Sequence, residues 1–128
     1  MRTRFATSLD EAAALEVVRA DGETTGRQPS KATLAALRAV LRSPTTLTLV
    51  ADDGGAVVGL LVAELVGREL QLSLLCVAPE HRRRGAGRSL VHALLERYPD
   101  VTAATDQAGA LALLDQERRR SQAGLDST

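Results

Sequence analysis

The chain of 128 residues is long enough for one folded domain. Sixteen basic and sixteen acidic residues cancel to a formal net charge of zero, which removes the case for nucleic-acid binding through a global basic field. No apolar run reaches the roughly 18 residues that span a bilayer, and the first residues lead into no signal-peptide core. We therefore expect a soluble, cytoplasmic protein with no nucleic-acid or membrane partner.

Cysteine and histidine are scarce in this sequence. Cys76 is the one cysteine, so no internal disulfide can form, and its place in an apolar stretch favours a packed small side chain over a nucleophile. His81 and His92 have no spacing typical of metal ligands. We expect no metal site.

The N-terminal part predicts one strand and two helices. Residues 2–7 are predicted as a short strand, and residues 8–11 then have the Ser-x-x-Glu spacing of a capping box, which opens a helix that Asp21-Gly22 ends. A second helix is predicted after Pro29-Ser30. It stops at Ser43-Pro44, because proline disfavours the helical conformation in the residue before it.

Three strands of an antiparallel meander are predicted next, over residues 45–51, 56–66 and 70–77. The first two are joined by Asp52-Asp53-Gly54-Gly55, a composition typical of a hairpin turn. Along the third strand, apolar and polar residues alternate until Leu74-Leu75, where two apolar residues adjoin. This break in the alternation predicts a β-bulge.

The C-terminal part predicts an amphipathic helix from about Arg88 to Tyr98, a short strand over residues 101–105 and a last helix over residues 107–120. Residues 121–128 are predicted to be a disordered tail. The sequence therefore predicts a single domain, residues 1–120, followed by that tail.

A basic glycine turn, Arg82-Arg83-Arg84-Gly85-Ala86-Gly87, lies between the third meander strand and the amphipathic helix. The two glycines leave backbone N–H groups open to an anion, and the start of a helix adds unpaired donors and a positive dipole end. Arginine side chains beside the turn would add charge-assisted hydrogen bonds. This order of elements predicts a phosphate-binding site; the alternative is a solvated basic turn in an arginine-rich chain.

The stretch 72–89, with Leu75-Cys76-Val77-Ala78-Pro79-Glu80-His81-Arg82-Arg83-Arg84-Gly85-Ala86-Gly87 at its centre, resembles the acetyl-coenzyme A binding segment of the GCN5-related N-acetyltransferase (GNAT) superfamily. The resemblance implies an α/β (α+β) fold: a mixed, mostly antiparallel central sheet of about five strands flanked by four helices, with the final strands shortened or missing. It also implies acetyl-coenzyme A as the cosubstrate. The residues that would bind it are Leu75 and Val77 through their backbone groups, together with Arg82, Arg83, Arg84, Gly85, Ala86, Gly87, Arg88, Ser89 and Gln107.

Two features depart from the family pattern. Superfamily members commonly carry Asn-x-x-Ala-x-x-x-Tyr after the strand that follows the cofactor helix, and its tyrosine protonates the leaving thiolate. The best alignment sets Gln107, Ala110 and Leu114 at the three specified positions, so no general acid is identified. The last two strands of the family also lack a counterpart, which implies a groove wall that is absent or borrowed; a homodimer and a monomer both stay open.

The acceptor side of the site is less defined by the sequence. An amine acceptor has to lose a proton, and Glu64 is the candidate general base because it follows apolar residues on one strand face; a solvated edge is the alternative. Gln71 and Ser73 are candidates to orient the acceptor by hydrogen bonds.

Three functions are compatible with these observations. The first is an N-acetyltransferase that moves the acetyl group of acetyl-coenzyme A directly to a primary amine of a small molecule or peptide. The second is a non-catalytic acyl-coenzyme A binding module that has lost the general acid. The third is an unrelated α/β protein that binds another phosphate ligand.

Overall fold

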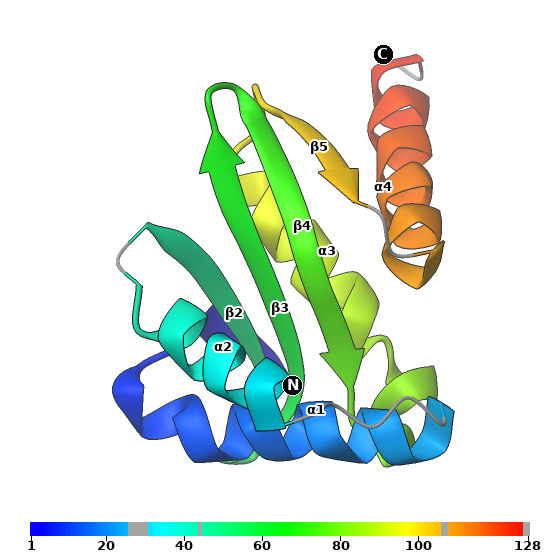
Figure 1. Cartoon of the computed structure of the whole chain (residues 1–128). Helices are drawn as coiled ribbons and strands as arrows, with labels where there is room; N and C mark the ends of the chain where they lie inside the picture. The colour runs from blue at the N-terminus through cyan, green and yellow to red at the C-terminus, as the bar shows by residue number, and fades with distance from the viewer. Residues whose placement is uncertain (26–30, 44, 106–107, 127–128) are drawn as a thin grey trace.

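The computed structural model describes residues 1–25, 31–43, 45–105 and 108–126 (Figure 1). Its helices and strands are β1 (Arg2–Phe5), the 3-10 helix η1 (Ser8–Asp10), α1 (Glu11–Thr25), α2 (Lys31–Leu41), β2 (Thr46–Asp53), β3 (Ala56–Val66), β4 (Glu69–Val77), the 3-10 helix η2 (Pro79–Arg84), α3 (Ala86–Arg97), β5 (Thr102–Thr105) and α4 (Ala108–Asp126). No helix within these ranges combines the length and the apolar character that a membrane span requires.

The strands form one sheet in the order β1-β2-β3-β4-β5. Neighbours from β1 to β4 are antiparallel, and β5 runs parallel to β4 because α3 carries the chain back along the sheet. Helices α1 and α2 lie on one side of the sheet and α3 on the other (Figure 1). These observations confirm the predicted mixed, mostly antiparallel α/β architecture.

Each face of the sheet covers its own apolar cluster, and β3 contributes to both. Successive strand residues point to opposite faces, so Leu60 and Val62 pack toward α1 and α2, whereas Leu61 and Ala63 pack toward α3. All four are buried. Helix α4 adds Leu114 to the α3-side cluster. Because helices cover both faces of the sheet, β3 is apolar at nearly every position.

A bulge divides β4 into two halves. The register with β3 shifts between Val62 and Ala63, which makes Ser73 the extra residue on β4, one position before the predicted Leu74-Leu75. The hydroxyl of Ser73 donates to the carbonyl of Val62 at 3.2 Å. The pairs between β4 and β5 end at Leu72, so the bulge begins where those pairs stop.

Two helices extend past their predicted ends. Helix α1 continues through the buried Gly22 to Thr25; a glycine costs about 1 kcal/mol relative to alanine inside a helix, and packing of α1 against the sheet offsets that cost. Helix α4 reaches Asp126, so residues 121–126 are helical where the sequence predicts a disordered tail. No proline interrupts the helix before that point.

Candidate active site

The turn after β4 is built by backbone hydrogen bonds. The N–H of Ala78 donates to the carbonyl of Val58 at 2.8 Å, and the N–H of His81 donates to the carbonyl of Ala78 at 2.8 Å. Helix η2 then leads to Gly85, which caps α3 with a φ of 78°. Glycine adopts this left-handed conformation without the strain that a Cβ causes, so the turn requires glycine here.

The start of α3 presents unpaired amides. Its first helical hydrogen bond runs from the N–H of Ser89 to the carbonyl of Gly85 at 2.9 Å. The N–H groups of Ala86, Gly87 and Arg88 precede that bond, so they have no acceptor within the helix. The space beside Gly85 is open, since a Cβ there would meet no atom within 4 Å. Amides in this position, with the positive end of the helix dipole, suit a phosphate or diphosphate.

The arginine side chains of the turn go to different places. Arg82 donates to Asp21 of α1 at 2.6 Å, and Nε of Arg88 lies 3.8 Å from the carboxylate of Glu117 on α4. Arg84 is exposed. Two arginines that the sequence predicts as phosphate contacts therefore face carboxylates of neighbouring helices, and Arg84 lies at the surface.

Gly87 lies where α3 packs closely against α4 and β4. A Cβ on this residue would lie 3.3 Å from Cδ1 of Leu113, 3.5 Å from Cγ2 of Val77 and 3.8 Å from Cδ2 of Leu75. The absent side chain lets α3 approach both α4 and β4. Both glycines of the turn were predicted to leave backbone amides open to an anion, whereas in the structure Gly85 supplies a backbone conformation and Gly87 a close contact.

Leu75 and Val77 lie in the half of β4 that continues past the last pair with β5. On the β3 side, they pair with Leu61 and Gly59. Their side chains are partly buried against the α3-side cluster. Leu75 and Val77 therefore lie next to the glycine turn, where β4 ends and α3 begins.

The predicted acceptor residues also lie together. Glu64 is exposed on β3 and pairs with Gln71 of β4 and Thr46 of β2. Register partners share a face of the sheet, so Glu64 and Gln71 are neighbours on the α1 side, and Glu64 lies two residues after the buried Val62. Ser73 follows at the bulge. This end of the sheet therefore presents a carboxylate, an amide and a hydroxyl within a few residues of one another.

The position aligned with the family tyrosine belongs to the core. Leu114 is 0% exposed and packs with Leu90 and Leu94 of α3. A leucine carries no transferable proton, so this position supplies no general acid. Two other predicted cofactor contacts, Gln107 and the side chain of Arg83, lie outside the described residues.

Several ionic contacts around the turn and α3 were not predicted from the sequence, and two of them join distant helices or segments. One joins Arg82 to Asp21, 61 residues away. The other joins His92 on α3 to Glu117 on α4 at 2.8 Å, and it raises the pKa of His92 above its ordinary value. Glu117 lies on the buried face of α4, three residues after Leu114. Residues three apart share a helix face, so a charged residue at this spacing from an apolar one is a sequence signal for a buried ionic partner.

The sequence matches the family described as "Acetyltransferase (GNAT) domain" over residues 10–110. The chain belongs to the GNAT family. The family excludes the alternative of an unrelated phosphate-binding α/β protein and confirms the resemblance read from the glycine turn. No curated protein matches this GNAT domain by sequence.

Solved structures share the fold of this GNAT domain. The ribosomal-protein-S18-alanine N-acetyltransferase from Escherichia coli is 20% identical, with a TM-score of 0.72 over 90% of this chain and 74% of its own. An aminoglycoside acetyltransferase from an uncultured soil metagenomic sample, in complex with sisomicin, is 16% identical, with a TM-score of 0.68 over 92% and 85%. An aminoglycoside 6'-N-acetyltransferase complexed with coenzyme A is 17% identical, with a TM-score of 0.64 over 77% and 56%.

Proposed function

We propose that this GNAT domain is an N-acetyltransferase that moves an acetyl group from acetyl-coenzyme A to a primary amine of a small molecule or peptide. The observation that carries the proposal is the turn from Gly85 into α3, with open space beside the glycine and amides that have no helical acceptor. The coenzyme A complex of a structural neighbour and the aminoglycoside and ribosomal-protein names of others support the same donor and acceptor classes.

The donor site follows from the residues that lie at the turn. The amides of Ala86, Gly87 and Arg88 would hold the diphosphate, and backbone groups of Leu75 and Val77 would pair with the amide chain of pantetheine, as an added strand does. Ser89 and the exposed Arg84 complete the set of polar groups at this end of α3. Acetyl-coenzyme A, when bound, supplies an activated thioester and a thiolate leaving group.

The acceptor site supplies positioning and a base. Glu64 accepts the proton of the acceptor ammonium, directly or through water, and Gln71 and Ser73 orient the amine by hydrogen bonds. The nitrogen–carbon bond forms as the carbon–sulfur bond breaks. Leu114 cannot protonate the thiolate, so the proton comes from another residue or from water. Loss of a general acid lowers the rate of such a reaction by roughly 10²- to 10⁴-fold without abolishing transfer, because a thiol of pKa about 8.5 is a tolerable leaving group.

The second candidate is a non-catalytic acyl-coenzyme A binding module. Its specific support is that Leu114, a fully buried leucine, occupies the position of the family tyrosine, so no acid is present there. Such a module binds coenzyme A and acetyl-coenzyme A and releases no thiol with any amine.

The test has two stages. Titration calorimetry with coenzyme A and acetyl-coenzyme A measures donor binding, and its absence would reject both candidates. Thiol release is then measured with a panel of aminoglycosides and N-terminal peptides. For the enzyme we expect Glu64→Gln to lower kcat by about 10²-fold with donor affinity unchanged, whereas Glu16→Gln, an exposed carboxylate of α1, changes neither. Thiol release equal in Glu64→Gln and wild type would exclude Glu64 as the base.

A further inference from the structure

Side chains hold the phosphate-binding turn from two directions. On one side, Nε2 of His81 lies 3.4 Å from the carboxylate of Asp53 at the β2–β3 hairpin. On the other, the guanidinium of Arg82 donates to the carboxylate of Asp21 at 2.6 Å. The side chains of Arg82 and Asp21 are 35% and 27% exposed, so the ion pair is partly accessible to solvent.

Asp21 also contacts the strand that leads into the turn. Its carboxylate hydrogen-bonds with the thiol of the buried Cys76, and burial together with that carboxylate raises the pKa of Cys76 to about 12. The thiol therefore stays protonated. The side chain of Asp21 thus contacts both Cys76 near the end of β4 and Arg82 in η2. Helix η2 leads directly into Gly85, so its position sets the position of that glycine.

We infer that Asp21 is a positioning residue for the diphosphate-binding turn, acting through Arg82. The inference rests on the proposed function, because it assigns Asp21 an effect on the affinity for coenzyme A. Arg82 is the first residue of the Arg-x-x-Gly-x-Gly turn, and in this geometry its guanidinium binds α1 instead of a phosphate. Its contribution to affinity is therefore indirect and depends on Asp21.

The affinity of the α3 backbone amides for an anion depends on the position of the turn that precedes them. The amides at the start of α3 bind an anion tightly only if the preceding turn holds them in place, because a binding site depends on the supporting residues that hold its contact groups. Asp21→Asn removes the charge that holds Arg82. A direct phosphate contact by Arg82 predicts the opposite sign, because loss of Asp21 would then release the guanidinium to the ligand.

The experiment is a double-mutant cycle read by titration calorimetry with coenzyme A. We expect Asp21→Asn and Arg82→Ala each to raise Kd by about tenfold, and the double variant to raise it no further, because both remove the same contact. Asp21→Glu keeps the carboxylate and restores most of the affinity. The control is Glu16→Gln, which removes an exposed ion pair with Arg19 on the same helix and leaves Kd unchanged.

The salt dependence of Kd separates positioning from direct contact. If Arg82 touches no phosphate, Arg82→Ala leaves the slope of log Kd against log salt concentration as in the wild type. Additive losses in the cycle, a smaller slope in Arg82→Ala, tighter binding by Asp21→Asn, or a lowered Tm with unchanged Kd would each overturn the inference. Where Asp21→Asn does not fold, Arg82→Gln carries the same slope test. A wild-type protein that fails to bind coenzyme A rejects the proposed function itself.

Discussion

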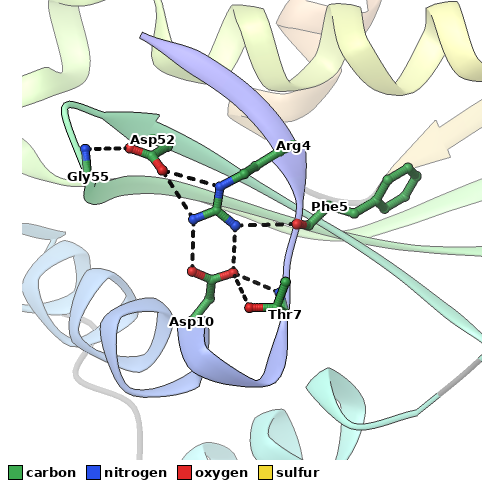
Figure 2. A network of polar contacts seen from close by, with 6 residues as sticks. All are labelled: Arg4, Phe5, Thr7, Asp10, Asp52 and Gly55. Carbon is green, nitrogen blue, oxygen red and sulfur yellow. Dashed lines mark hydrogen bonds and ion pairs between the residues drawn. The ribbon is translucent and has the colours of Figure 1, made fainter.

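The carboxylate of Asp10 is the centre of a polar network at the N-terminal end of α1 (Figure 2). It accepts hydrogen bonds from the two terminal nitrogens of Arg4 at 2.7 and 3.0 Å, and from the backbone N–H and the hydroxyl of Thr7 at 2.7 and 3.3 Å. Arg4 also donates to Asp52, which in turn accepts from the N–H of Gly55. The network therefore joins β1, the start of α1 and the β2–β3 hairpin.

These contacts make the stability of the fold depend on the charge of Asp10. The hydrogen bonds from Arg4, opposed by burial, lower the pKa of Asp10 from 3.8 to about 2. A carboxylate whose pKa is lower in the folded state stabilises the fold above its ordinary pKa, and that stabilisation is lost as the pH falls through the folded value. At about 1.4 kcal/mol per pH unit, the difference between these pKa values corresponds to roughly 2 kcal/mol.

The test is urea unfolding of the wild type and Asp10→Asn at several pH values. We expect the variant to lose roughly 2 kcal/mol of unfolding free energy at pH 7. The difference should shrink between about pH 5 and pH 2, because protonated aspartic acid and asparagine are both neutral. Asp100→Asn, an exposed position in the turn after α3, serves as the control. An equal loss at pH 7 and pH 2 would refute the reasoning, since it would mean that shape rather than charge is responsible.

Three further predictions concern α3 and α4. Gly87→Val should lower the unfolding free energy in urea by about 1–3 kcal/mol, because even a Cβ lies 3.3 Å from Leu113, so this variant perturbs the fold and not the anion site alone. Leu114→Tyr should also lose about 1–3 kcal/mol by overpacking, with no gain in thiol release; a faster variant would mean that the side chain reaches the donor. Protonated His92 stabilises the fold because its pKa is raised above the ordinary value of 6.5; this stabilisation is complete below pH 6.5 and is lost as the pH rises through the raised pKa. The Tm difference between wild type and His92→Gln should therefore shrink toward pH 9. A difference that stays constant with pH would contradict the ion pair with Glu117.

The sequence predicted those elements that local chemistry defines at both ends. Strand β3 has the predicted bounds, because a double-glycine turn precedes it and Gly67 follows it. The glycine turn was predicted to lie between a strand and an amphipathic helix, as it does, although α3 begins at Ala86, before the predicted start near Arg88. Gly22 misled the prediction of the end of α1, because its cost inside a helix is small beside the packing of that helix on the sheet.

The sequence by itself determined the order of the elements and the place of the glycine turn, because periodicity and glycine conformation act within a few residues. The motif in residues 72–89 indicated the family. Only the tertiary structure decided that Arg82 binds Asp21, that Gly87 serves a helix contact and that Leu114 is core. Those outcomes depend on where α1 and α4 dock on the sheet. Burial of apolar surface determines where these helices dock. The hydrophobic effect is non-directional, so the spacing of residues in the sequence does not show which surfaces will meet.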